Sequence, residues 1–305
     1  MDAPTTPLKL GTRASPLALV QAELVRDALL AVHGWATDAI SIVAMTASGD
    51  RILDRSLAEV GGKALWTKEL DAALLSGEID FAVHSMKDVE TIRPAVITIA
   101  AMMPRADVRD RLIGADSIAD LPHGARIGTN SPRRTAQLLH LRPDLQMTLF
   151  RGNVATRLRK LALAEADATL LAAAGLDRLG MQDIGAPISA DQMLPAPAQG
   201  AIGIEARAGD EAIIAILAAI TDEATHSCVM VERAFLFGLS GSCQSPVACQ
   251  AEVRGSGFFI RYEILTPDGS ERLADSAEIG GPDDVITLAH GLLDRASPAL
   301  RACFG

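Results

Sequence analysis

The sequence predicts an α/β protein in which two related α/β domains are followed by a small α+β domain. Three observations support this fold class. Short apolar strands alternate with helical segments over about the first 200 residues, as in βαβ units. A Gly-Thr opening followed by a Ser-Pro step occurs at residues 11–16 and again at 128–132. After about residue 221 the alternation gives way to a helix, several strands and a final helix.

The first domain is predicted from residue 8. A short strand at 8–11 leads into the Gly-Thr turn, and Pro16 stands where helices often begin, ahead of helical periodicity over 17–32. Residues 40–45 and 80–84 have the composition of strands, and a helix at 68–76 is expected to end at Gly77. The polar, Pro-containing stretch 103–111 predicts a crossing into the second domain.

The second domain repeats this alternation. Strands are expected at 126–128, 146–150 and 168–172, with helices at 133–141 and 154–163. Because helical crossovers join parallel strands, we expect largely parallel sheets. The Pro- and Gly-punctuated stretch 194–203 predicts a return crossing, followed by a helix over 210–220.

The last part of the chain has a different pattern. We expect a helix at 225–239, strands near 248–253 and 258–266, a Pro-Asp-Gly turn, a further strand and a final helix from Pro282. Strands and helices that are not regularly alternated predict a small α+β domain.

Composition excludes several classes of protein. The net charge is −10, which argues against a general binder of nucleic acid or of anionic membranes. No apolar stretch approaches the roughly 18 residues of a membrane span, and the first residues lack the apolar core of a secretion signal, so we expect a cytoplasmic protein. Four cysteines without a CxxC pair predict neither a disulfide framework nor a zinc site.

Arginine is unusually frequent among the basic residues, at 23 against five lysines. Composition bias is one explanation. The other is a set of sites for planar anions, since guanidinium groups pair bidentately with carboxylates and stay charged when partly buried. Any single arginine could be a solvated helix residue, but their recurrence near predicted strand-to-helix turns favours anion binding. The arginines concerned are Arg13, Arg133, Arg134, Arg151, Arg157 and Arg178.

Other candidate residues leave alternatives open. Asp88 follows an apolar strand and could act in proton transfer, although spacing alone favours a helix cap. His84 is more typical of a near-core histidine than of a catalyst. Cys243 lies in a turn of small residues, where an inert buried thiol is the usual outcome. The Gly61-Gly62-Lys63 segment lacks the spacing of a phosphate-binding loop and is a weak candidate for a lid.

Eight blocks of the sequence resemble the porphobilinogen deaminase family, also called hydroxymethylbilane synthases, in order and approximate spacing. They cover nearly the whole chain and are GTRASPLAL, VGGKALWTKEL, DFAVHSMKDV, GTNSPRRTAQL, RGNVATRL, AAAGLDRLG, LPAPAQGAIGIE and GSCQSPVA. The resemblance implies two domains like type II periplasmic binding proteins, at 1–101 with 198–219 and at 102–197. It also implies an α+β domain at 220–305.

The resemblance further implies a transferase of tetrapyrrole biosynthesis that joins four porphobilinogen molecules head to tail with release of ammonia, giving hydroxymethylbilane. It implies a monomer with a covalent dipyrromethane cofactor and no metal, nucleic-acid or membrane partner. The matching catalytic carboxylate is Asp88, and the thioether cysteine is Cys243. Matching cofactor-binding positions are Lys87, Thr129, Ser131, Arg133, Arg134 and Arg157. Matching substrate-binding positions are Arg13, Ser15, Lys63, Trp66, Arg151, Arg157, Arg178 and Gln199.

The sequence departs from the family pattern at Ala64, Trp66, Glu90 and Ser242, where Gly, Phe, Pro and Gly are usual. Ser242 should be tolerated if its φ is negative, and the other changes leave lid dynamics and turnover rate open. The alternative function is that of a cytoplasmic two-lobe anion-binding protein without catalysis, which would explain the arginine turns but neither Asp88 nor Cys243.

Overall fold

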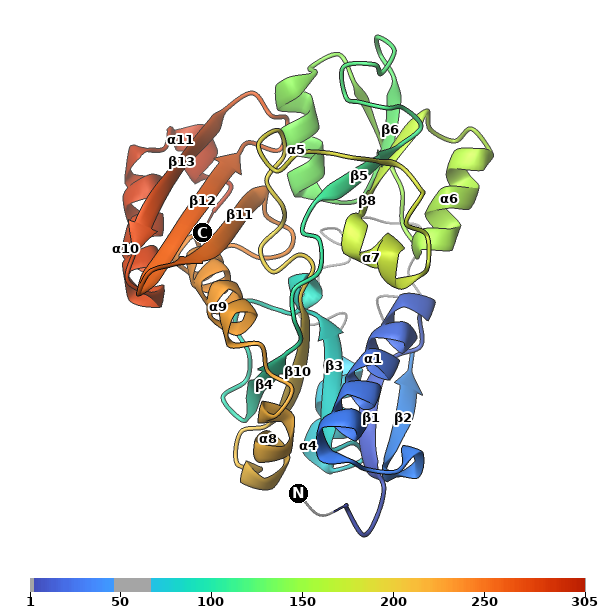
Figure 1. The fold of residues 1–305 in the computed structure, drawn as a ribbon. Helices are drawn as coiled ribbons and strands as arrows, with labels where there is room; N and C mark the ends of the chain where they lie inside the picture. The colour runs from blue at the N-terminus through green and yellow to red at the C-terminus, as the bar shows by residue number, and fades with distance from the viewer. Residues whose placement is uncertain (1–2, 47–66, 305) are drawn as a thin grey trace. The chain divides into compact units, whose positions relative to one another are not determined.

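The computed structural model describes residues 3–46 and 67–304, which form two compact units (Figure 1). One unit contains residues 3–46, 67–106 and 201–226. The other contains residues 107–200 and 227–304. The chain therefore leaves the first unit after Ala106, returns at Ala201 and leaves again after His226.

The first unit is built on a five-stranded sheet of order β2-β1-β3-β10-β4. Its strands are β1 (Leu8–Arg13), β2 (Ile40–Met45), β3 (Phe81–Ser85), β4 (Ile97–Met102) and β10 (Ile202–Arg207). Its helices are α1 (Pro16–His33), α4 (Lys68–Ser76) and α8 (Glu211–Ala218), with short 3₁₀ helices η1 (Thr37–Ala39) and η2 (Met86–Asp88).

Helix α1 shows how local sequence sets the ends of an element. The Ser15 hydroxyl accepts a hydrogen bond from the Ala18 N–H at 3.4 Å, and Pro16 fills the first helical position. Gly34, with φ of 68°, ends the helix in the left-handed conformation. The helix buries Val25 and Leu29 in the core of this sheet.

The second unit contains a five-stranded sheet of order β7-β6-β8-β5-β9 and a three-stranded sheet of order β11-β12-β13. The first of these has strands β5 (Asp110–Ile113), β6 (Arg126–Thr129), β7 (Gln146–Leu149), β8 (Ala168–Ala172) and β9 (Ala186–Pro187), with helices α5 (Pro132–Leu141), α6 (Val154–Ala162) and α7 (Ala173–Arg178). The second has strands β11 (Val247–Arg254), β12 (Gly257–Leu265) and β13 (Arg272–Ile279), with helices α10 (Pro282–Arg295) and α11 (Pro298–Arg301). Helix α9 (Glu223–Gly238) precedes it.

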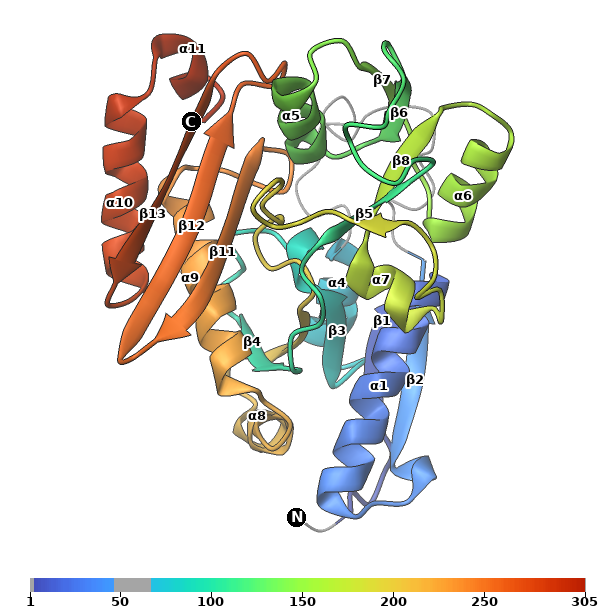
Figure 2. The ribbon, with the colours of Figure 1, turned by 45° about the horizontal axis from the view of Figure 1, so that its top comes forward.

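The three-stranded sheet has its own apolar core. Phe235 from α9 lies against Tyr262 on β12 with ring centroids 5.0 Å apart, and Val285 and Leu292 from α10 belong to the same cluster. Figure 2 shows α10 beside this sheet. An antiparallel sheet with helices packed on it is the predicted α+β domain.

The prediction of largely parallel sheets is wrong, because both five-stranded sheets are mixed. In the first, β1 is parallel to β2 and β3, but β10 is antiparallel to β3 and β4. In the second, β6 is parallel to β7 and β8, but β5 is antiparallel to β8 and β9. Strands β5 and β10 are the ones by which the chain enters from the other unit. A strand that follows such a crossing is not bound to the direction that a helical crossover imposes.

The predicted helices and strands are otherwise found within one to three residues of their expected ends. Strands β5, β9 and β10 and helices α7 and α11 are additions, and β5 and β10 begin inside the stretches 103–111 and 194–203 that the sequence predicts as crossings. The fold class is confirmed as α/β, with two five-stranded α/β sheets and a small three-stranded α+β part. The three predicted domain ranges stay a prediction.

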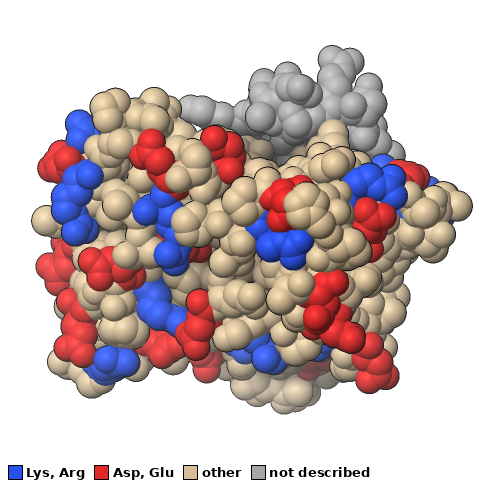
Figure 3. Space-filling view, turned by 90° about the horizontal axis from the view of Figure 1, so that it is seen from above, with Lys and Arg blue, Asp and Glu red and all other residues tan. Residues whose placement is uncertain are grey.

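The face of the molecule in Figure 3 carries basic and acidic side chains intermixed.

Candidate active site

A small pocket of about 60 Å³ in the first unit contains the predicted catalytic carboxylate. It is lined by Arg13, Ser15, Leu17, Ala18, Gln21, Thr67, Val83, His84, Ser85, Asp88 and Val89. Three residues that the sequence predicts for the site therefore come together here: Arg13, Ser15 and Asp88. A cation, a hydroxyl and a carboxylate in one pocket can hold an anionic group beside a proton-transfer group.

The topology explains why these residues meet. Arg13 is the last residue of β1, and η2 with Asp88 follows β3 directly. Because β1 and β3 are parallel neighbours, their carboxyl ends lie at the same edge of the sheet. Ser15 stands at the amino end of α1 on the same side.

Asp88 is not a helix cap. It is the last residue of the 3₁₀ helix η2, and the next regular element in this part of the chain is strand β4. The capping alternative is therefore wrong.

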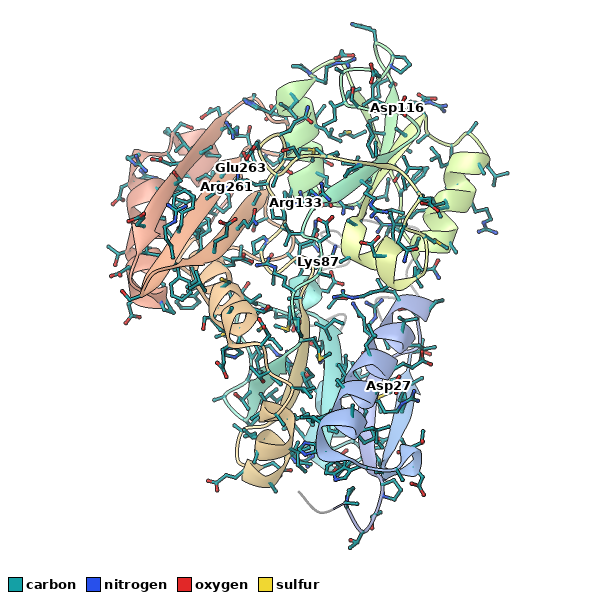
Figure 4. All side chains as sticks on the ribbon, in the orientation of Figure 1. Asp27, Lys87, Asp116, Arg133, Arg261 and Glu263 are labelled. Carbon is teal, nitrogen blue, oxygen red and sulfur yellow. The ribbon has the colours of Figure 1, made fainter. Side chains whose placement is uncertain are left out.

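Gln21, buried on α1, exchanges hydrogen bonds with the Ser85 hydroxyl at 2.9 and 3.0 Å. Figure 4 marks Lys87 in the same turn.

His84 is buried beside a carboxylate, as a near-core histidine should be. Its Nε2 lies 3.2 Å from Glu205 Oε2 on β10, close enough for an ion pair although not aligned for a hydrogen bond. Glu205 has no exposed surface and also pairs with Arg93 through two contacts of 2.8 Å. Burial raises the pKa of Glu205, but His84 and Arg93 outweigh burial and lower it to about 2.

In the second unit two predicted cofactor ligands share one buried carboxylate. Arg133 and Arg134, in the first turn of α5, donate to the two oxygens of Asp110 at 2.8 and 2.7 Å. Asp110 Oδ1 also accepts from Gln199 Nε2 at 2.9 Å. Glu263 on β12 accepts from the Gln137 amide and, at 2.6 Å, from Arg272. Figure 4 labels Arg133 on α5 and Glu263 on β12.

This cluster is positively charged. The guanidinium groups of Arg133, Arg134 and Arg272 face the carboxylates of Asp110 and Glu263, which leaves one positive charge in excess. Burial lowers the pKa of Arg133, and the Arg134 charge acts in the same direction. A guanidinium nevertheless stays protonated, so the site favours an added anion. The buried Nε atoms of both α5 arginines lack a hydrogen-bond partner among the described residues.

The remaining predicted residues of the second unit lie at or just after the end of a strand, or in the helix that follows it. Thr129 ends β6 and is buried, and Ser131 caps α5 by accepting from the Arg134 N–H at 3.4 Å. Arg151 is buried just after β7, while the Arg157 Nε on α6 donates to the Gly152 carbonyl at 3.0 Å.

Arg178 departs from the predicted pattern. It ends the short helix α7 instead of lying at a strand-to-helix turn, and it donates to the Gly200 carbonyl at 2.8 Å. Burial lowers its pKa. Gln199, fully buried, donates to the Val108 carbonyl at 2.7 Å as well as to Asp110.

Cys243 is exposed, against the base-rate expectation of a buried thiol. It lies in a tight turn in which the Ser245 N–H donates to the Ser242 carbonyl at 2.9 Å. The Ser245 hydroxyl accepts from the Ser242 N–H at 3.0 Å. Ser242 does not have a positive φ, so the condition for tolerating serine in place of glycine is met. A turn closed by its own hydrogen bonds presents the thiol to solvent.

Three predicted positions, Lys63, Ala64 and Trp66, lie outside the described residues. Within the described ranges no group of His, Cys, Asp or Glu side chains is arranged to hold a metal ion. No single helix there is long and apolar enough to cross a membrane, and one bent helix pair meets that test by length and composition only.

Sequence reasoning missed several residues of these sites. Gln21, Asp110 and Glu205 are polar side chains at buried positions of α1, β5 and β10, and each is at most 2% exposed. A buried polar group needs a partner, so an isolated polar residue on the apolar face of a helix or strand was the available signal. The identity of the partner was not available from the sequence.

Comparisons with known proteins give the same family for both parts of the chain. The model of the porphobilinogen deaminase dipyromethane cofactor binding domain matches residues 8–215, and that of the porphobilinogen deaminase C-terminal domain matches residues 226–294. The porphobilinogen deaminase of Sphingopyxis alaskensis is 57% identical over 100% of this chain and 98% of its own length. That of Paracoccus denitrificans is 52% identical over 92% of this chain and 90% of its own length.

Among solved structures, an arginine-specific periplasmic binding protein from Salmonella typhimurium matches with a TM-score of 0.40 and 14% identity, over 73% of this chain and 95% of that chain. An ancestral arginine-binding protein matches with a TM-score of 0.40 and 15% identity, over 72% of this chain and 92% of that chain.

The fold is that of an α/β protein in which two buried arginines of the second unit share one carboxylate. The chain belongs to the porphobilinogen deaminase family. This confirms the predicted hydroxymethylbilane synthase activity and the dipyrromethane cofactor, and it excludes the alternative of a binding protein without catalysis.

Proposed function

We propose that Asp88 is the catalytic carboxylate for head-to-tail condensation of four porphobilinogen molecules into hydroxymethylbilane, and that Cys243 bears the cofactor. The pocket that brings Asp88 together with Arg13 and Ser15 is the observation that carries this proposal. It supplies a carboxylate for charge stabilisation and proton transfer next to groups that bind an anion.

The residues present fit a dipyrromethane that is covalently attached. Thioether formation requires an accessible thiol, and Cys243 is exposed in its turn. The acidic side chains of such a group require cationic partners, and the Arg133–Arg134–Asp110 cluster has an excess positive charge and unpartnered buried Nε atoms. Lys87, Thr129, Ser131 and Arg157 are proposed as further ligands. When bound, the group supplies the pyrrole α-carbon to which the first substrate is joined.

The reaction balances with water as its only co-reactant: four substrate molecules lose four molecules of ammonia, and after the fourth addition water breaks the bond that joins the chain to the cofactor and supplies the hydroxyl group of the released hydroxymethylbilane. The C–N bond of the substrate aminomethyl group breaks and ammonia leaves, which produces a cationic azafulvene. The α-carbon of the terminal pyrrole then forms a C–C bond to it and loses its proton. The Asp88 carboxylate is proposed to stabilise the cation near the pyrrole N–H groups and to accept or relay protons.

Arginine suits the remaining positions because each added unit brings two more carboxylates. Arg13, Arg151, Arg157 and Arg178 are proposed to bind these acetate and propionate groups, together with Ser15, Gln199, Lys63 and Trp66. Fixed guanidinium charges do this without depending on pH, whereas a buried lysine can lose its charge. We also propose a monomer in the cytoplasm, with no nucleic-acid or membrane partner.

Asp88→Asn tests the assignment directly. We expect a folded protein with the cofactor assembled, measured by intact mass, and turnover lowered by at least about a hundredfold, since general acid–base groups contribute 10²–10⁴-fold. The matched control is Asp27→Asn, which changes an exposed carboxylate on α1 that pairs with Arg26 in the same unit. Near-normal turnover of Asp88→Asn with intact cofactor would remove Asp88 from the chemistry.

A further inference from the structure

We propose that Arg93 is a positioning residue that clamps both ends of the turn carrying Asp88. The clamp consists of Arg93 with Glu90, Glu205 and His84. It rests on the proposed function, because its effect is exerted through Asp88. The sequence pattern does not predict a role for Arg93 or Glu205, and Glu90 is notable in the sequence only because the family usually has Pro at that position.

The first end of the turn is held through Glu205. His84 stands one residue before the end of β3, and its Nε2 is 3.2 Å from Glu205 Oε2. The two side chains lie on one face of the sheet, because Glu205 pairs in register with Ala82, two residues before His84. Gly203 lies opposite His84 and leaves room for Met86 of the turn.

The second end is held through Glu90, two residues after Asp88. Glu90 Oε2 accepts from Arg93 at 2.8 Å and from the Thr67 hydroxyl at 2.8 Å. Thr67 precedes α4 and lines the same pocket as Asp88. Glu90 therefore joins the end of the turn to the pocket wall.

Arg93 connects the two ends. Its Nε and one terminal nitrogen contact both oxygens of Glu205 at 2.8 Å, and the same terminal nitrogen reaches Asp71 on α4 at 2.5 Å. The other terminal nitrogen contacts Glu90 and, at 3.3 Å, Thr67. The guanidinium is 9% exposed, and the nearby carboxylates raise its pKa although burial opposes this. One cation thus fixes β10, α4 and the segment after Asp88 relative to one another.

Such a clamp matters because catalysis depends steeply on the position of the acting group. A displacement of about 1 Å can cost about a hundredfold in rate. The pocket residues Arg13 and Ser15 come from β1 and the start of α1, and not from β3, β10 or α4, which the clamp joins, so substrate binding should depend on it less than turnover does. The expected signature is a loss in kcat with KM nearly unchanged.

Glu90→Ala and Glu90→Gln form the matched pair for the test, since Glu90 is partly exposed and its loss leaves the buried Arg93–Glu205 pair intact. Glu90→Ala should lower kcat by about tenfold with KM within about twofold and cofactor mass unchanged. Glu90→Gln should recover most of that loss, because an amide oxygen can still accept from Arg93 and Thr67. Arg93→Gln should lower kcat further, and its melting temperature is measured alongside.

Arg207→Gln is the control for general loss of stability. Arg207 lies on the same strand as Glu205 and makes four polar contacts, with Asp210, Asp80 and the carbonyls of Leu74 and Ile79, but it does not line the pocket. The Arg207→Gln variant should have a lower melting temperature than the unmodified protein, with a kcat within about twofold of it.

The clamp is overturned if kcat of Glu90→Ala stays within twofold of the unmodified protein, or if Arg207→Gln lowers kcat as much as Glu90→Ala does. Asp88→Asn is measured in parallel, to distinguish the role of the clamp from the catalytic role of Asp88. An inactive Asp88→Asn beside a fully active Glu90→Ala refutes the clamp alone. An active Asp88→Asn refutes the proposed catalytic role instead.

Discussion

Asp110 carries one carboxylate against two guanidinium groups, and all three side chains are at most 5% exposed. The Asp110 carboxylate stabilises the two guanidinium groups electrostatically as well as by hydrogen bonds. Its removal would leave two buried positive charges without their paired carboxylate. The carboxylate also fixes the orientation of both arginines before any ligand arrives. Asp110 is therefore the residue on which the geometry of the second site depends.

Asp110→Asn should destabilise the protein by about 3–5 kcal/mol, the usual cost of breaking a buried ion pair on one side. The measurement is urea unfolding followed by circular dichroism. Asp167→Asn is the control, since the Asp167–Arg126 pair is more than 40% exposed on both sides and should change stability much less. Equal effects of the two substitutions would show that Asp110 has no special role.

The ionisation of Glu205 predicts a pH dependence of stability. Its pKa is about 2 in the folded protein against an ordinary value of 4.5. A carboxyl with a lowered pKa stabilises the folded state when it is ionised. Its contribution is therefore complete above about pH 4.5 and is lost as pH falls towards 2.

Glu205→Gln should remove that dependence. Between pH 4.5 and 2, the free energy of unfolding should fall less steeply for the variant than for the unmodified protein. Glu278→Gln, which changes an exposed carboxylate paired with Arg254, serves as the control and should keep the original slope. Parallel curves for Glu205→Gln and the unmodified protein would contradict the assignment.

At the scale of elements, the ends of neighbouring strands do most to assemble the site. Strands β1 and β3 bring Arg13 and the Asp88 turn to one edge, and β10 places Glu205 beside β3. The pairing of β10 with β3 also requires a glycine at position 203, because a Cβ there would overlap the side chain of Met86. Packing between two strands thus controls the turn on which Asp88 lies.

Gly203→Ala tests this packing. The added methyl group should displace Met86, which is fully buried, lower stability by about 1–3 kcal/mol and reduce kcat. Gly209→Ala is the matched control, since nothing lies within 4 Å of a Cβ at that position in the same unit. Stability and turnover are measured for both variants. An unchanged kcat in Gly203→Ala would show that the turn is not sensitive to this contact.

At the scale of the whole molecule, a chain with a net charge of −10 buries four arginines and four carboxylates among its described residues, so the excess of negative charge does not come from the buried positions. Composition bias remains a sufficient account of the total of 23 arginines, and several of them pair with exposed carboxylates, as Arg126 and Arg254 do. The arginines of α5 are different, because their burial beside a single carboxylate has no explanation in composition.

Intact mass is the matching whole-molecule prediction. The purified protein should exceed its sequence mass by two deaminated porphobilinogen units, and Cys243→Ser should abolish the excess. Cys303→Ser changes a partly exposed thiol elsewhere in the same unit and should retain it. An excess that persists in Cys243→Ser would place the attachment at another residue.

The sequence by itself determined the family and the order of most helices and strands, because these depend on local patterns and on motifs in a fixed order. From those motifs it predicted Asp88, Cys243 and the arginines as site residues. It also predicted the small-residue turn around Cys243, whose hydrogen bonds are local. It failed at β5 and β10, because a strand that enters from another unit takes its direction from the crossing and not from its own residues.

Only the tertiary structure decided which groups meet. Asp110 and Arg133 are 23 residues apart, and Arg93 and Glu205 are 112 apart, so no periodicity links them. Their pairing follows from the burial of charged groups, each of which needs an opposite charge at contact distance once water is removed. The sequence contains the charged residues that impose that requirement, but the partner that meets it is fixed only when the sheets are assembled.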